Sequence, residues 1–284
     1  MKPGQDMGLR EVKIFDTTLR DGIQGLGVAL EDRLAVFAML DEAGLDVIEV
    51  ALVGARSRNL AQVRAAAATI QNARVCCIAS PEPEAITRAG RALRQARRSR
   101  IHTFNGVASG RKNGRVRDRL GQIKAAVASA RAVCDDVEWA ALDATRSTPD
   151  FLCRAVETAI RAGATTVNIA DTMGVVLPEE FANIIRDLIA RVPNIDKATI
   201  SVHCHDDLGL ATANSLAAIQ AGARQVECAI NGLGPKGGNA NLQEVVTALA
   251  RRGDALGGRC GVDGAKLAQL GALVRDLVPA RSRH

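Results

Sequence analysis

The chain has 284 residues, 47% of them apolar and 24% charged, so it can bury a sizeable core and is not disordered as a whole. Seven cysteines without a CxxC pair, no signal-peptide pattern and no apolar run of membrane-spanning length argue against structural disulfides, secretion and a membrane partner, and favour the cytoplasm. The net charge of +6 comes largely from the arginine-rich runs 91–100 and 111–119, which no stacking aromatic residues accompany, so we expect no nucleic-acid partner.

Short apolar runs rich in β-branched residues alternate with helical patterns along the chain. The predicted strands are 12–16, 46–52, 74–79, 100–104, 137–141, 165–170, 199–205 and 225–230. The predicted helices between them include 31–44, 150–163, 178–192 and 210–222, and several end in Ala-Gly, the expected C-terminal signal. Because aromatic residues are scarce, we expect Ala, Val, Leu and Ile to build the core, which suits the packed interior of a parallel barrel.

Eight such strand–helix units predict a parallel sheet with right-handed crossovers, closed into a (β/α)₈ TIM barrel. No GxGxxG motif follows the first strand, which disfavours a dinucleotide-binding fold. We expect one catalytic domain over residues 1–284, with its core at about 11–255, a C-terminal helix and tail at 263–284, and no regulatory domain.

The active site of such a barrel lies at the carboxyl ends of the strands. The polar residues at the predicted ends are Arg20, Asp21, His102, Asn168, Thr172, His203 and His205, followed by the Gly-rich loop 231–239. His203 and His205 share one face of a strand, and Asp21 follows a strand that is close to theirs in a closed barrel. The three side chains suit Zn²⁺, Mn²⁺, Fe²⁺ or Mg²⁺, whereas two hydrogen-bonded histidines at a strand end are the alternative.

The other polar residues suggest anion binding. Arg20 is suited to grip a substrate carboxylate or enolate, although an ordinary ion pair with Asp21 would also explain it. Loop 231–239 can offer backbone N–H groups to an anion with help from Lys236, or it is only a turn. Asn239 offers an amide oxygen to a metal or a substrate. The run 91–100 is interpreted as solvated helix faces, and the run 111–119 as a solvated loop or a contact for phosphates.

Six motifs, in this order, closely resemble the DRE-TIM metallolyases, with the 2-isopropylmalate and homocitrate synthases nearest. They are DTTLRDG-x-Q (16–24), IHTF (101–104), DATR-x-x-PDFL (143–152), DTMG (171–174), HCHDDLGLATANS (203–215) and GLG-x-x-GGNA-x-L (232–242). The resemblance extends from about residue 11 to residue 250.

The resemblance implies that Asp21, His203 and His205 ligate a divalent metal (Mg²⁺, Mn²⁺ or Zn²⁺), with Asn239 nearby. It implies that Arg20 stabilises an enolate oxygen and that Thr172 contacts the carboxylate of a 2-oxo acid. The remaining residues that it assigns are Gln24 as catalytic, His102 and Asn168 as substrate-binding, and Gly234, Lys236, Gly237 and Gly238 as CoA-binding.

The activity that the resemblance implies is a Claisen-type condensation of acetyl-CoA, or another acyl-CoA, with a 2-oxo acid. A carbon–carbon lyase or aldolase, like hydroxymethylglutaryl-CoA lyase or the 4-hydroxy-2-oxoacid aldolases, is the alternative. A third interpretation is a partner-dependent subunit, because the sequence departs from the synthase pattern. Ile23, Ala140 and Leu142 replace two carboxylates and a serine, and Pro235 and Lys236 alter the Gly-rich loop. We therefore expect a homodimer, or a hetero-oligomer whose second subunit supplies missing catalytic groups.

Overall fold

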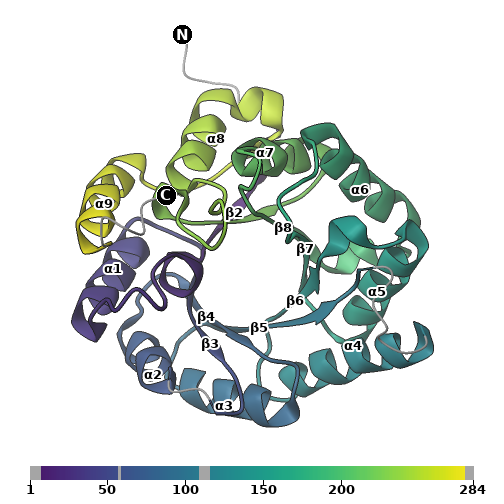
Figure 1. Ribbon diagram of the computed structural model, residues 1–284, viewed down its shortest axis with the longest axis horizontal. Helices are drawn as coiled ribbons and strands as arrows, with labels where there is room; N and C mark the ends of the chain where they lie inside the picture. Colours follow the sequence, from purple (N-terminus) through teal and green to yellow (C-terminus); the bar gives the residue numbers. More distant parts are fainter. Residues whose placement is uncertain (1–7, 57–58, 109–115, 279–284) are drawn as a thin grey trace.

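The computed structural model describes residues 8–56, 59–108 and 116–278, and its eight long strands form a closed parallel barrel in chain order (Figure 1). The strands are β2 (Lys13–Asp16), β3 (Val47–Val53), β4 (Arg74–Ala79), β5 (Ser99–Gly106), β6 (Val137–Leu142), β7 (Thr166–Asp171), β8 (Thr199–Cys204) and β9 (Gln225–Cys228). β9 pairs with both β8 and β2, which closes the ring and brings the ends of β2 and β8 near each other. The predicted TIM barrel is confirmed.

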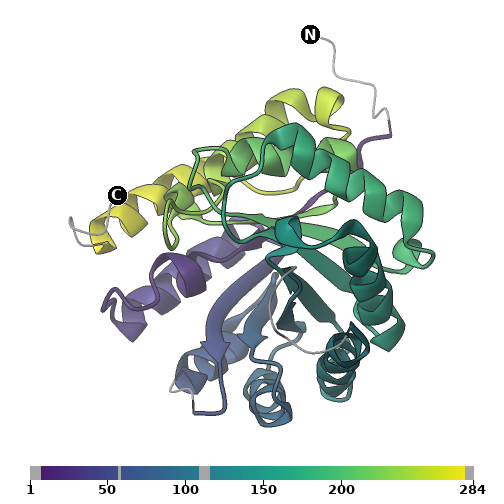
Figure 2. The same cartoon turned by 45° about the vertical axis from the view of Figure 1, so that its right-hand side comes forward.

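Helices surround the strands, as Figure 2 shows from the side. They are α1 (Leu30–Glu42), α2 (Leu60–Thr69), α3 (Pro83–Leu93), α4 (Val116–Arg131), α5 (Pro149–Ala162), α6 (Pro178–Arg191), α7 (Ala211–Ala221), α8 (Leu242–Leu256) and α9 (Gly264–Leu277). Proline begins α3, α5 and α6, where its fixed φ suits the first helical position. None of the helices in the described ranges combines the length and apolarity that crossing a membrane requires.

A second, two-stranded sheet was not predicted. β1 (Arg10–Glu11) pairs in parallel with β10 (Gly258–Arg259), and the backbone N–H of Val12 donates to the carbonyl of Arg259 over 2.8 Å. The sheet ties the segment before β2 to the segment after α8. The C-terminal helix predicted within 263–284 is α9, which packs beside α1 (Figure 1), and residues 279–284 lie outside the described part of the chain.

The two faces of the barrel strands differ in polarity. Side chains alternate along a strand, and the outward set, for example Ile48, Val167 and Val202, is apolar and packs beneath the helices. The inward set is largely polar. The expectation that Ala, Val, Leu and Ile build the core is confirmed, but this core lies mainly in the layer between strands and helices rather than inside the barrel. Composition counts apolar residues but does not say which face they occupy.

Arg100 shows the polar interior most clearly. It is 1% exposed and donates to Asp136 (3.0 Å), Glu138 (2.7 Å) and Gln225 (2.8 Å) across the barrel. The interpretation of run 91–100 as solvated helix faces suits the exposed Arg91 on α3, but it is wrong for Arg100. The reason is that α3 has ended and β5 has begun at Ser99, so that the next side chain points inward.

Candidate metal and substrate site

A short π-helical turn, η1 (Thr18–Gly22), follows β2 and carries Arg20 and Asp21. Its position is fixed by Thr18, whose Oγ1 donates to Asp16 Oδ2 over 2.5 Å and accepts from the backbone N–H of Ile230 over 2.8 Å. Burial raises the pKa of Asp16 to about 7. These contacts join the turn to the segment after β9, so that Asp21 faces the end of β8.

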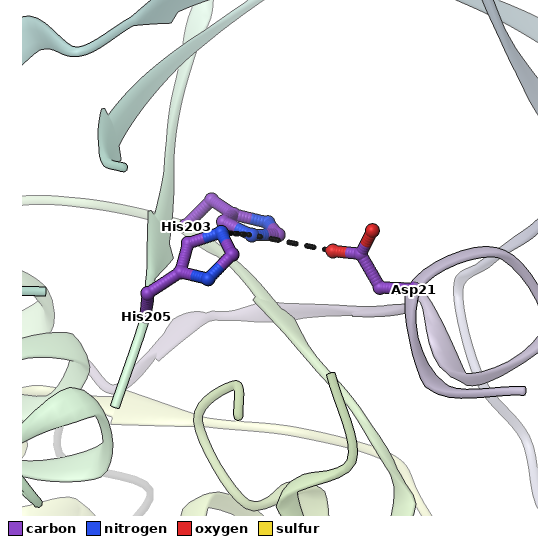
Figure 3. Close-up of side chains that lie close together, drawn as sticks. All are labelled: Asp21, His203 and His205. Carbon is purple, nitrogen blue, oxygen red and sulfur yellow. Dashed lines mark hydrogen bonds and ion pairs between the residues drawn. The ribbon is translucent and has the colours of Figure 1, made fainter. Parts of the chain in front are cut away.

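His203 and His205 converge on Asp21 from the end of β8 (Figure 3). His203 Nε2 lies 3.3 Å from His205 Nε2 and 3.6 Å from Asp21 Oδ2. The three residues each offer one ligand atom, and these atoms lie within 4.8 Å of one another. Burial lowers the pKa of both histidines to about 4, so at neutral pH they are in the uncharged form that binds metals.

Two buried oxygens, one in this cluster and one beside it, are available to coordinate a cation. Asp21 Oδ2 and Asn239 Oδ1 have no hydrogen-bond donor among the described residues. Asn239 is held by an antiparallel bridge to His205 and by its own Nδ2, which donates to the Leu233 carbonyl over 2.9 Å, so its Oδ1 is left for another partner. An oxygen and two imidazole nitrogens, with an amide oxygen nearby, form a donor set that a divalent metal would satisfy.

The Gly-rich loop that carries Asn239 packs closely against the loop after β8. A Cβ at Gly234 would overlap Asn239 Nδ2, and a Cβ at Gly237 would lie 2.5 Å from the carbonyl oxygen of Asp206. These close contacts, within the Gly-rich loop and between the two loops, explain the two glycines without any ligand. The CoA contacts assigned to Gly234, Lys236, Gly237 and Gly238 stay predictions.

Arg20 is anchored on its inner side by Glu49, a fully buried residue of β3. Glu49 accepts from Arg20 Nε over 2.5 Å and from His102 Nδ1 over 2.8 Å. Burial alone would raise the pKa of Glu49, but Arg20 and His102 lower it to about 2. Arg20 also contacts Asp21, so one guanidinium links the metal cluster to the Glu49–His102 pair.

His102 is cationic at neutral pH. Burial alone would lower its pKa, but the neighbouring Glu49 and Glu227 raise it to about 9. Its Nε2 is buried and has no partner among the described residues, although the ring lines the central cavity. An imidazolium with a free Nε2–H is a donor for an anionic oxygen.

Glu227, on β9, contacts His203 on the side of the ring away from Asp21. His203 Nδ1 and Glu227 Oε2 are hydrogen-bonded over 2.5 Å, and Asn168 Nδ2 donates to Glu227 Oε1. Burial raises the pKa of Glu227 well above its usual range. Glu49 and Glu227 were not among the residues predicted from the sequence. Each is a single glutamate within an apolar strand, and this pattern could have indicated a functional residue because a buried charge needs a partner.

A small cavity at the barrel mouth joins these groups. Its lining is Arg20, Ile78, His102, Ala140, Leu142, Asn168, Ala170, Thr172, His203, His205 and Glu227. The structure therefore brings together the residues predicted to bind substrate with two of the predicted metal ligands. Thr172 Oγ1 also accepts from the backbone N–H of Asp143 over 2.8 Å, which fixes its position.

A wider outer cavity lies beside the central one and shares Arg20, Ile78 and Leu142 with it. Gln24 lines the outer cavity, and Pro235 is the residue of the Gly-rich loop that does so. Lys236 Nζ instead donates to the Thr172 carbonyl over 2.7 Å. In the run 111–119, residues 111–115 lie outside the described part of the chain, and Arg119 stacks on Phe151 at 4.0 Å.

Residues 11–274 match the family model described as HMGL-like. The chain belongs to this family. The 2-isopropylmalate synthase of Afipia carboxidovorans is 48% identical over 269 residues, which cover 93% of this chain and 52% of the relative. That of Aeromonas salmonicida is 45% identical over 272 residues, covering 94% and 52%. The resemblance to the synthase branch is confirmed, and the chain spans about half the length of these curated relatives.

Solved structures of other proteins share the barrel. The hydroxymethylglutaryl-CoA lyase of Pseudomonas aeruginosa superposes with a TM-score of 0.78 at 20% identity, covering 98% of this chain and 97% of that one. The carboxyl transferase domain of Rhizobium etli pyruvate carboxylase gives 0.76 at 17% identity, covering 95% and 48%. At these identities the likeness shows the fold alone.

Proposed function

We propose that this chain catalyses a metal-dependent condensation of acetyl-CoA, or another acyl-CoA, with a 2-oxo acid, in the manner of an isopropylmalate synthase. The observation that carries the proposal is the shared cavity of Arg20, His102 and the two histidines of the metal cluster. The identity of 44–48% to curated 2-isopropylmalate synthases supports this activity over the lyase alternative, whose structural relatives show the fold alone.

In this proposal Asp21, His203 and His205 hold a divalent metal, with Asn239 Oδ1 beside it. A bound Mg²⁺, Mn²⁺ or Zn²⁺ supplies Lewis acidity toward the carbonyl oxygen of the substrate. The fit rests on the convergence of the three side chains and on the buried oxygens that have no donor among the described residues.

The protein groups around the metal cluster position charge. Arg20, fixed by Glu49 and Asp21, presents its guanidinium to the oxygen on which negative charge develops. His102 directs its free Nε2–H to an anionic oxygen of the 2-oxo acid, and Thr172 and Asn168 line the same space. Because Arg20 and His102 are held before the substrate binds, little reorganisation is needed during the reaction.

The outer cavity is the proposed approach for the acyl group. Gln24 lies on its wall, and Pro235 places the Gly-rich loop at its rim. We assign the CoA contacts to that loop, at Gly234, Lys236, Gly237 and Gly238. The methyl carbon of the acetyl group loses a proton and bonds to the ketone carbon, after which water cleaves the thioester and releases the CoA thiol.

A partner subunit would complete the site. Leu142 and Ala140 line the central cavity where a carboxylate and a hydroxyl would serve proton transfer, and neither side chain can exchange a proton. We therefore propose a homodimer or hetero-oligomer in which another subunit contributes the missing acid or base. The apolar side chain of Leu142 at this position favours a second candidate function, that of a subunit with little activity alone.

The test is release of free thiol from acetyl-CoA with Mg²⁺, Mn²⁺ or Zn²⁺ and a panel of 2-oxo acids, with and without the proteins encoded beside this chain. Thiol release that requires both a metal and a 2-oxo acid is the expected result. Cleavage of a 3-hydroxyacyl-CoA or a 4-hydroxy-2-oxo acid, with no thiol release across the panel, would show a lyase or aldolase instead.

A further inference from the structure

The two histidines of the metal cluster are held in different ways. His203 Nδ1 lies 2.5 Å from Glu227 Oε2, whereas His205 Nδ1 has no side-chain partner among the described residues and its ring instead meets the backbone of Pro235. A neutral imidazole carries one N–H, and the nitrogen that binds a metal must be the other one. The hydrogen bond to Glu227 places the proton on Nδ1 and leaves the Nε2 lone pair directed at Asp21 and His205.

We infer that Glu227, itself oriented by Asn168, is a positioning residue that fixes His203 in the metal-binding tautomer. The inference rests on the proposed metal site but goes beyond its ligand set. It also gives Asn168 a second role: besides lining the cavity, its Nδ2 donates to Glu227 Oε1 and to Ser201 Oγ.

Burial makes this arrangement strict. Glu227 and Asn168 are each 1% exposed, so loss of one partner leaves a buried polar group without its hydrogen bond. The Asn168 amide directs its N–H₂ toward Glu227, and one carboxylate oxygen accepts from it while the other accepts from His203. As a carboxylate, the form that His102 and Arg20 favour against the effect of burial on its pKa, Glu227 accepts on both sides, whereas an amide at position 227 has one accepting and one donating end.

The substitution Glu227→Gln should therefore change the position of the proton on the His203 ring. Asn168 Nδ2 takes the single carbonyl oxygen of Gln, and the Gln N–H₂ then faces His203 Nδ1. His203 Nδ1 must accept, its proton moves to Nε2, and the metal-facing lone pair is lost. Outer-sphere partners of this kind affect metal affinity by about 10–100-fold, so we expect the Kd for Mn²⁺ to rise by that factor.

A double variant exchanges the amide and the carboxylate between positions 168 and 227. In Asn168→Asp combined with Glu227→Gln, the total charge is unchanged, and the new carboxylate at position 168 accepts from the Gln N–H₂. The Gln carbonyl oxygen then faces His203 Nδ1 and restores its proton. We expect the double variant to recover Mn²⁺ affinity, which a purely structural role of Glu227 would not produce.

The matched control is Glu138→Gln. Glu138 is a buried glutamate of the same interior that pairs with Arg100; it accepts from Asn168 Nδ2 over 3.4 Å, the longest of that amide's three hydrogen bonds, and contacts neither Glu227 nor a histidine of the metal cluster through a hydrogen bond. This control should lose stability while it keeps the wild-type Kd for Mn²⁺. Thermal unfolding of each metal-free variant shows whether it is folded.

Two measurements test the inference on the purified full chain. One is calorimetric titration with Mn²⁺, and the other is ¹⁵N NMR of the imidazoles, which is tractable because the chain has four histidines. Protonated Nδ1 at His203 in the wild type, and protonated Nε2 in Glu227→Gln, are expected. Wild-type Mn²⁺ affinity in a folded Glu227→Gln variant, with its His203 tautomer unchanged, would overturn the inference. Failure of the wild type to bind Mn²⁺ would instead contradict the proposed metal site, and the tautomer in the metal-free protein would still decide the role of Glu227.

Discussion

The inner and outer faces of the same eight strands are built by different rules. On the outer face, residues such as Ile169 and Val202 are fully buried among helix side chains, and their contribution is the transfer of apolar surface from water. On the inner face, Arg100, Glu138 and Glu227 are as deeply buried but depend on specific partners. The outer face therefore determines the fold, and the inner face determines the chemistry at the barrel mouth.

Removing a ligand at the inner face should have the largest effect. His203→Ala takes one of two imidazoles from the cluster, so we expect loss of Mn²⁺ binding beyond the roughly 10–100-fold that an outer-sphere change causes, with activity lost as well. Asp207→Asn, an exposed carboxylate two residues beyond His205, is the control and should bind normally. Full metal content in His203→Ala would contradict the assigned ligand set.

Arg100→Met breaks an interior ion pair that includes none of the metal ligands. It leaves Glu138 and Asp136 without their shared cation, and removal of one partner from a buried pair costs about 3–5 kcal/mol in the free energy of unfolding. Arg97→Met, on the exposed part of the same run, should change it by less than about 0.5 kcal/mol. Chemical denaturation measures both, and equal effects would contradict the inner-face interpretation.

Ile169→Ala tests the outer face. Ile169 is fully buried, and truncation of such a side chain costs about 2–5 kcal/mol in the free energy of unfolding. The same change at Ile189, which is 41% exposed on α6, should cost much less. Both variants should bind Mn²⁺ as the wild type does, and a weakened affinity in Ile169→Ala would show that the two faces are not independent.

The smallest effect is a pH dependence of stability. The pKa of His102 rises from 6.5 to about 9 on folding, so its stabilising contribution is complete below pH 6.5 and is lost as the pH rises through 9. Between pH 7 and pH 10 we expect a loss on the order of 1–3 kcal/mol from this group, measured by denaturation. His102→Gln should show a smaller decline over the same range, and an equal decline would assign it to other groups.

The difference between the faces also explains what the sequence could predict. The barrel followed from alternating strand and helix patterns, and the cluster of Asp21, His203 and His205 followed from period-two spacing and the adjacency of strand ends. Glu49, Glu227 and Arg100 did not follow, because their partners lie on other strands, up to 125 residues away in the chain. The spacing of residues along a strand reveals which face of the sheet a side chain occupies. Its hydrogen-bond partner depends instead on how the barrel closes.

The Gly-rich loop after β9 illustrates a second limit. Its glycines suggested an anion cradle, yet Gly234 and Gly237 also meet neighbouring atoms so closely that no side chain fits. Sequence reveals the absence of a Cβ but not whether a ligand or another loop occupies the space.

The most direct test of the central claim is thiol release from acetyl-CoA by the wild type and by His203→Ala, with the neighbouring gene products present and with or without a chelator. We predict release that depends on a 2-oxo acid in the wild type, abolished both by the chelator and by His203→Ala. Release that persists in the chelator or in the variant, or its absence from the wild type with every 2-oxo acid tested, would contradict the account.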